Sequence, residues 1–115
     1  MSGSDRLSQN ARNIMVDFNN DLVLSTASLW EMAIKTSIGK LELLDSFDRL
    51  IPVQLEKHAI DVLSIRLDHI SKIIDLELYH RDPFDRLIIA QGITEQIPII
   101  TSDAMFAKYP VKVIW

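Results

Sequence analysis

Three acidic side chains, far apart in the sequence, are the residues best suited to do chemistry. Glu31 and Asp103 each follow closely on a short apolar run, and Asp85 lies in the stretch HRDPFDRLIIAQ. Crowded carboxylates repel one another, by about 4 kcal/mol for two charges ~4 Å apart at an effective dielectric of about 20. A divalent cation offsets this repulsion, and carboxylate and water ligands suit Mg²⁺ or Mn²⁺. Such a cation activates water and neutralises charge at a phosphodiester, so phosphodiester hydrolysis is one chemistry that a shared acidic site would allow, beside helix-capping roles for the same residues.

The acidic residues of HRDPFDRLIIAQ also have an ordinary structural interpretation. Asp82 precedes Pro83, and aspartate is a good N-cap while proline is favoured at the first helical position. Asp85 then occupies the third helical position, where a carboxylate meets the positive end of the helix dipole. Capping is sufficient for Asp82, whereas for Asp85 capping and metal binding both remain open.

Glu31 and Asp103 have similar alternatives. Ser28 is followed three residues later by Glu31, which matches a capping box at a helix start. Asp103 could cap a short helix that begins at Ala104. If the strands before them are parallel, however, Glu31 and Asp103 lie on the same rim of one sheet, where Asp85 could join them.

The elements that would position these residues alternate along the chain. Apolar runs bounded by polar residues predict strands, and apolar side chains at helical spacing predict helices, one ending near Gly39. This alternation predicts an α/β fold with a mostly parallel sheet and helices on both faces. The predicted strands are 21–26, 61–65, 97–102 and 111–115; the predicted helices are 5–18, 27–40, one within 41–59 that is broken or delayed around Pro52, 66–77, 83–96 and a helical turn at 103–109.

Length and composition narrow the possible classes of protein. The chain has 115 residues, 48% hydrophobic, which fits a single domain spanning 1–115. The absence of cysteine excludes disulfides, thiolate zinc sites and cysteine nucleophiles, and it fits a cytoplasmic location. No apolar stretch is long enough to span a membrane. The net charge of −4 argues against bulk electrostatic binding of nucleic acid, unless cations mediate the contact or the partner is basic.

The histidines offer no metal-ligand pattern. His58, His69 and His80 are scattered, without a helical pair at i, i+4, so surface or core roles are expected for them. Ser28 and Ser102 lack the histidine and aspartate partners that nucleophilic catalysis would require.

Four separated blocks, in order, resemble the PIN-domain toxins of the VapC type. These blocks are STASLWEMAIKTSIGKLEL, HRDPFDRLIIAQ, IPIITSD and YPVKVIW, and the resemblance extends from about Asp5 to Trp115. It implies an α/β/α sandwich with a parallel sheet and a ribonuclease activity that depends on Mg²⁺ or Mn²⁺. It also implies RNA as substrate, a homodimer and a cognate antitoxin as partner.

The resemblance also implies roles for individual residues. Catalytic and metal-binding roles fall to the three acidic residues, with Asp82 as a secondary metal candidate. Thr101 and Ser102 could orient Asp103 or a bound water. Arg81 and Arg86 could contact phosphate, and the alternative for both is a solvated helix end. The metal and catalytic set is therefore Glu31, Asp85 and Asp103.

The chain departs from the family at its first residues. Members of the family begin with a hydrophobic central strand that ends in an aspartate, whereas MSGSDRLS resembles the region just after that strand. Asp5 cannot replace the aspartate, because it lies at the start of the next helix. A missing central strand predicts closure of the gap by neighbouring strands, or pairing between subunits in a homodimer that could be domain-swapped.

The same departure predicts weak or absent ribonuclease activity, because displacing a reacting group by ~1 Å can cost on the order of a hundredfold in rate. The alternative function is a catalytically dead PIN remnant that binds an antitoxin or associates with itself. In a third hypothesis the acidic residues are only helix caps and the chain is a structural domain.

Overall fold

The computed structural model describes residues 8–115, which divide into two compact units. Unit 1 comprises residues 8–20 and 66–115, and unit 2 comprises residues 21–65. Unit 2 is therefore one continuous segment, and unit 1 is built from the two segments on either side of it. Within residues 8–115, no helix is both long enough and apolar enough to cross a membrane. The single domain expected for 1–115 stays a prediction.

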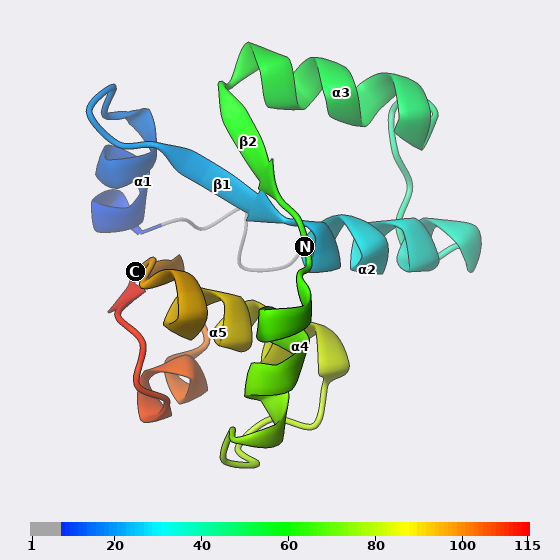
Figure 1. Ribbon diagram of the computed structural model, residues 1–115. Coiled ribbons are helices and arrows are strands. Elements are labelled where there is room, and N and C mark those ends of the chain that lie inside the picture. Colours follow the sequence, from blue (N-terminus) through cyan, green and yellow to red (C-terminus); the bar gives the residue numbers. More distant parts are fainter. Residues whose placement is uncertain (1–7) are drawn as a thin grey trace. The chain divides into compact units, whose positions relative to one another are not determined.

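Unit 2 is a pair of parallel strands joined by two helices (Figure 1). Leu22 pairs with Ile60 and Ser25 with Leu63. Just past the ladder, the Thr26 hydroxyl donates to the Leu63 carbonyl oxygen at 3.0 Å. The elements of this unit are β1 (Leu22–Ser25), α2 (Thr26–Ser37), α3 (Phe47–Lys57) and β2 (Ile60–Leu63).

Helix α2 begins earlier than the capping-box pattern predicted. Its N-cap is Ser25, whose hydroxyl accepts the Ala27 N–H at 3.0 Å. The capping box at Ser28 is therefore wrong: a serine one turn earlier provides the cap, and Ser28 is already inside the helix. The predicted end near Gly39 is confirmed, because Gly39 follows the helix with a left-handed φ of 76°.

Helix α3 does not break at Pro52. It begins after Ser46 and continues through Pro52 to Lys57. Proline removes one backbone donor from the helix interior and usually kinks or ends it, which is why a break was predicted. The prediction is wrong here, because the helix continues past that position for more than one further turn.

Unit 1 holds the remaining elements and a second pair of parallel strands. Its first helix ends at Val16, short of the predicted Phe18, whose side chain is fully exposed. The part of that prediction covering 5–7 lies outside the described residues. The elements of unit 1 are α1 (Gln9–Val16), α4 (Leu67–Ile74), α5 (Pro83–Glu95), β3 (Ile99–Ile100), the 3₁₀ helix η2 (Ala104–Lys108) and β4 (Val113–Ile114).

The core of unit 1 forms around helix α5. Ile89 is fully buried and packs in one cluster with Phe106 and Tyr109. Gly92 lets α5 come close to the segments that follow it, because a Cβ there would lie 2.8 Å from the Ile99 side chain and 3.1 Å from that of Val111. The same helix therefore builds the core and, at its first turn, carries Asp85.

The predicted α/β class with parallel strands is confirmed. The strands are shorter than predicted, and among residues 8–115 they form two separate parallel pairs, β1–β2 and β3–β4. Closure of the gap by neighbouring strands, or by pairing between subunits, stays a prediction, because the two pairs belong to different units.

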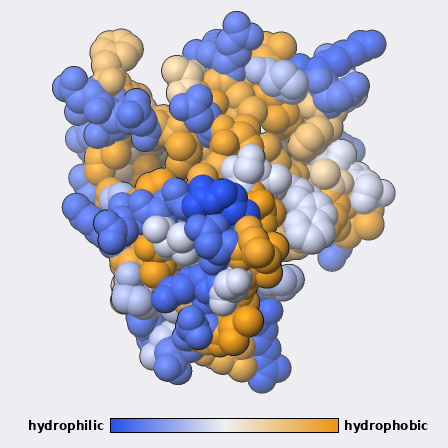
Figure 2. All heavy atoms as spheres, in the orientation of Figure 1, coloured by the Kyte–Doolittle hydropathy of each residue, from blue (hydrophilic) through white to orange (hydrophobic). Residues whose placement is uncertain are grey.

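Large hydrophobic side chains remain on the surface, and several patches are visible in Figure 2. On α2, Trp30 and Ile34 are 54% and 38% exposed, and Ile38, the C-cap that follows the helix, is 58% exposed. Their four-residue spacing places them along one face of the helix. We call these three residues the α2 stripe.

Candidate metal centre

Asp82 and Pro83 set the start of α5. The Asp82 Oδ1 atom accepts the N–H of Phe84 at 2.8 Å and that of Asp85 at 3.1 Å. Pro83 is the first helical residue, where its missing N–H costs nothing. The predicted cap is confirmed, and it fixes the backbone of Asp85 in the first turn.

Asp103 follows β3 and caps η2, as predicted. Its Oδ1 atom accepts the Met105 N–H at 2.9 Å, and its own N–H donates to the Thr101 hydroxyl oxygen at 3.1 Å. Thr101 thus helps to fix the turn that carries Asp103, while Ser102 is exposed.

The fold of unit 1 brings Asp85 and Asp103 together, and His80 joins them. One ligand atom from each of the three lies within 4.8 Å of the others. His80 Nε2 lies 2.9 Å from Asp103 Oδ2, and the Asp103 side chain is 42% exposed. The hydrogen bond from His80, aided by the Met105 N–H, lowers the pKa of Asp103 against the opposing effect of desolvation. Asp103 is therefore an ionised carboxylate that solvent and ions can reach.

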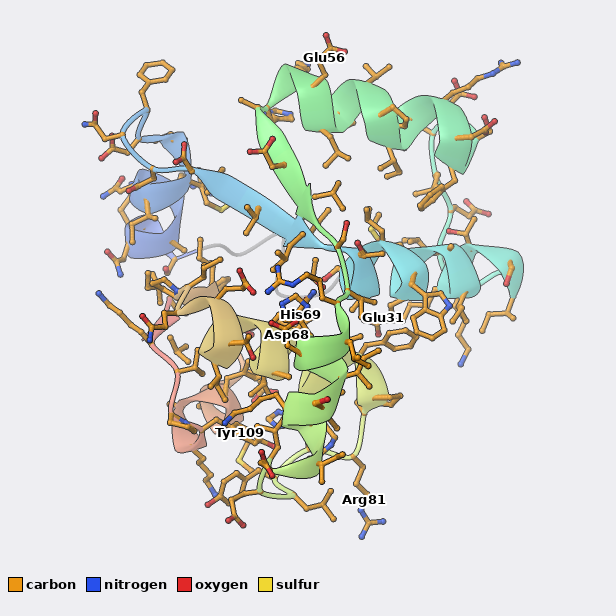
Figure 3. The ribbon with its side chains drawn as sticks, viewed as in Figure 1. Glu31, Glu56, Asp68, His69, Arg81 and Tyr109 are labelled. Carbon is orange, nitrogen blue, oxygen red and sulfur yellow. The ribbon has the colours of Figure 1, made fainter. Side chains whose placement is uncertain are left out.

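Glu31 belongs to unit 2, where it lies on α2 (Figure 3). Its carboxylate pairs with Lys35 one turn later, at 3.1 Å. Because Ser25 caps α2, the capping-box explanation of Glu31 no longer applies. Its assignment to the metal set stays a prediction.

The two arginines differ sharply in their surroundings. The Arg86 guanidinium donates to the carbonyl oxygens of Ile73, Glu77 and His80 at 3.2, 3.1 and 3.3 Å. Arg86 therefore connects α5 to the segment that precedes it. The alternative of a solvated helix end does not apply to this residue. Arg81 is exposed and extends away from the ribbon in Figure 3. Phosphate contact by either residue stays a prediction.

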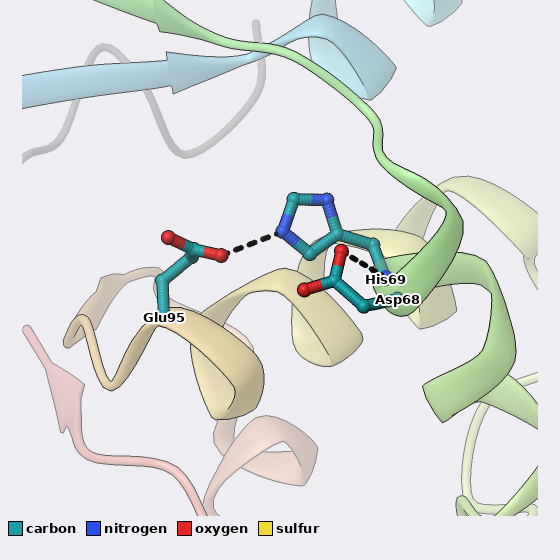
Figure 4. A group of neighbouring side chains, drawn as sticks. All are labelled: Asp68, His69 and Glu95. Atoms are coloured by element: carbon teal, nitrogen blue, oxygen red, sulfur yellow. Dashed lines mark hydrogen bonds and ion pairs between the residues drawn. The ribbon is translucent and has the colours of Figure 1, made fainter.

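A second acidic group in unit 1 contains Asp68, His69 and Glu95 (Figure 4). The fully buried His69 accepts the Arg66 backbone N–H at Nδ1, at 3.0 Å. Its proton is therefore on Nε2, which donates to Glu95 Oε2 at 2.9 Å. A cation at Nε2 would force that proton onto Nδ1 and break the bond to Arg66.

The Arg66 guanidinium forms ion pairs with both carboxylates of this group. It pairs with Asp68 at 3.0 Å and also with Glu95. These bonds lower the pKa of Asp68 chiefly through Arg66, and that of Glu95 through His69 and then Arg66. Because one guanidinium already neutralises both carboxylates, this group acts as a structural link between α4 and α5.

His80 is the site residue that the sequence pattern did not reveal. Its side chain is only 9% exposed, which fits the expected core role, but it also reaches Asp103. The two residues are 23 positions apart, so no local spacing connects them. The only available signal was the position of His80 within HRDP, two residues before Asp82.

The parallel strand pairs and the helices between them define an α/β protein. In unit 1, Asp85 in the first turn of α5 and Asp103 at the start of η2 belong to a group of side chains that could hold a metal ion. The model of the PIN-domain family matches residues 3–112, nearly the whole chain, and the chain belongs to that family. PIN domains are generally nucleases and typically bind a divalent metal, which the acidic site fits. Comparisons with curated proteins and with solved structures found no match.

Proposed function

We propose that the chain is a metal-dependent endoribonuclease of the VapC toxin type. The observation that carries this proposal is the meeting of Asp85 and Asp103, which come from different elements yet place ligand atoms within 4.8 Å of each other. Membership of the PIN family supplies the nuclease class. The toxin type, with a cognate antitoxin, a homodimer and a cytoplasmic location, rests on the sequence blocks that resemble VapC.

In this proposal Asp85 and Asp103 hold the cation, and Glu31 and Asp82 are the further acidic candidates. Mg²⁺ or Mn²⁺ would supply an activated water and neutralise charge on the phosphodiester. Thr101 fixes the turn that presents Asp103. The net charge of −4 fits an RNA contact that cations mediate rather than one that depends on a basic surface.

The test replaces one anionic ligand without changing its size. Asp85→Asn should lower the Mn²⁺-dependent cleavage rate of a labelled single-stranded RNA by about a hundredfold, because a neutral amide holds the cation poorly. Chelation with EDTA should abolish cleavage by the unaltered protein. The cleavage rate is followed by gel electrophoresis of the labelled RNA.

Asp68→Asn is the matched control, since it makes the same change in the other acidic group. Its cleavage rate should stay within about twofold of the unaltered protein, as for an exposed substitution away from the site. An unchanged cleavage rate in Asp85→Asn would contradict the assignment of Asp85 to the metal site. If the unaltered protein cuts no RNA in Mn²⁺, the enzyme proposal fails.

The second candidate is a binding module that associates with itself or with an antitoxin. The α2 stripe favours it, because adjacent exposed apolar side chains on one helix face are typical of interaction surfaces. An apolar helix face of this kind suits burial against a second protein surface rather than against RNA.

Ile34→Glu tests the second candidate by placing a charge in the middle of the α2 stripe. We expect the unaltered protein to be a dimer by size-exclusion chromatography with light scattering, and the variant to be a monomer. A charge buried in an apolar interface without a partner is strongly unfavourable. Val53→Glu, at a residue 60% exposed on α3, is the control and should remain dimeric. A monomeric unaltered protein would contradict the proposed self-association.

A further inference from the structure

His80 is a nearly buried imidazole beside the acidic site. Its ring packs edge-on against Phe106, with centroids 4.9 Å apart and planes at 78°, and it lies 5.5 Å from the Tyr109 ring. Phe106 and Tyr109 are each only 4% exposed. The ring therefore packs against core side chains, while its Nε2 atom lies 2.9 Å from Asp103 Oδ2.

The hydrogen bonds around His80 determine which ring nitrogen carries the proton. The Tyr109 hydroxyl oxygen accepts the His80 backbone N–H at 2.9 Å. His80 Nδ1 lies 3.1 Å from the same oxygen and can accept the hydroxyl proton when the ring proton is on Nε2. Because an ionised carboxylate only accepts hydrogen bonds, the 2.9 Å contact between His80 Nε2 and Asp103 Oδ2 places the ring proton on Nε2.

Both oxygens of Asp103 are therefore held by donors of this chain. Oδ2 receives His80 Nε2–H, and Oδ1 receives the Met105 N–H. Each carboxylate oxygen can accept more than one hydrogen bond, so both retain a lone pair for a further ligand. Fixing a ligating carboxylate through an outer hydrogen bond is a general way to orient metal ligands.

We propose that His80 is a positioning residue that aims the Asp103 carboxylate at the cation, and that Tyr109 in turn holds the His80 ring. This inference rests on the proposed function, because it assigns a role within the same site. His80 itself is not placed in contact with the cation.

Two substitutions distinguish the effect of the N–H that His80 donates from the effect of its ring packing. His80→Phe keeps a buried ring and the backbone N–H to Tyr109, but it removes the donor to Asp103. Its dissociation constant for Mn²⁺, measured from the free-ion electron paramagnetic resonance signal, should rise about tenfold. His80→Gln places an amide N–H near the lost Nε2–H and should return the constant to within about threefold of the unaltered protein.

His69→Gln is the matched control, because His69 is also a buried imidazole paired with a carboxylate at 2.9 Å. It should lower the melting temperature but leave Mn²⁺ affinity within about twofold. Unchanged affinity in His80→Phe would overturn the inference. So would a failure of His80→Gln to restore affinity while its melting remains cooperative, because an N–H donated to Asp103 would then not be what supports Mn²⁺ binding.

A second measurement does not depend on metal binding. Nitrogen-15 NMR of the unaltered, metal-free protein should show the His80 ring proton on Nε2, and Asp103→Asn should shift that resonance. A proton on Nδ1 would overturn the inference. If the unaltered protein binds no Mn²⁺ while the NMR result is as expected, the proposed function fails and the hydrogen bond between His80 and Asp103 stands.

Discussion

Replacing Ile89 with alanine should lower the free energy of unfolding by about 3–4 kcal/mol, the range for large-to-small changes in a closed core. Ile89 is fully buried and belongs to the cluster with Phe106 and Tyr109. The core of unit 1 is small, so few neighbouring side chains can move to fill the cavity. Urea denaturation followed by circular dichroism measures the loss.

Ile74→Ala makes the same chemical change at an exposed position of the same unit. Ile74 is 85% exposed, so the free energy of unfolding should change by no more than about 0.5 kcal/mol. Similar losses for the two variants would show that Ile89 is not the centre of a closed core.

Replacing Arg86 with alanine should lower the free energy of unfolding by about 2 kcal/mol, because it removes a charged donor shared by three carbonyl oxygens. Those oxygens belong to Ile73, Glu77 and His80, so Arg86 anchors the segment that leads into α5. Thermal and urea denaturation measure the loss. Mn²⁺ affinity should fall as well, because the same segment carries His80.

Arg81→Ala is the control for this prediction, since it removes the same charge from an exposed position five residues earlier. Its stability should change by no more than about 0.5 kcal/mol. If Arg86→Ala changed the free energy of unfolding as little as Arg81→Ala, the three hydrogen bonds of Arg86 would make no net contribution to stability. If Arg81→Ala slowed RNA cleavage while leaving stability unchanged, the predicted phosphate contact of Arg81 would gain support.

Elements with strong local signals were predictable from the sequence. The Asp82–Pro83 cap fixed the start of α5, and Gly39 marked the end of α2, because both depend on neighbouring residues alone. The capping box at Ser28 failed because Ser25 offers an equivalent hydroxyl one turn earlier. The continuation of α3 through Pro52 overrode a local preference that usually ends helices.

The site was predictable only in part. The position of Asp103 directly after a strand and that of Asp85 in a first helical turn were visible as patterns, and the fold does bring the two together. The contact between His80 and Asp103 depends on how η2 and the segment before α5 pack, which no spacing encodes. The division of the strands into two pairs was equally hidden, because apolar runs identify strands but not their partners.

The placement of unit 2 within the sequence has a consequence for the order of folding. Unit 1 can form only when residues 20 and 66 come together, which closes a loop of about 45 residues. Closing a flexible loop of that length costs roughly 3 kcal/mol in chain entropy, apart from a constant. Pairing of β1 with β2 joins Leu22 to Ile60 and so removes most of that loop. If the parallel pair of unit 2 forms first, most of this entropy cost is met within unit 2, and only the short segments 20–22 and 60–66 remain to be closed when unit 1 forms.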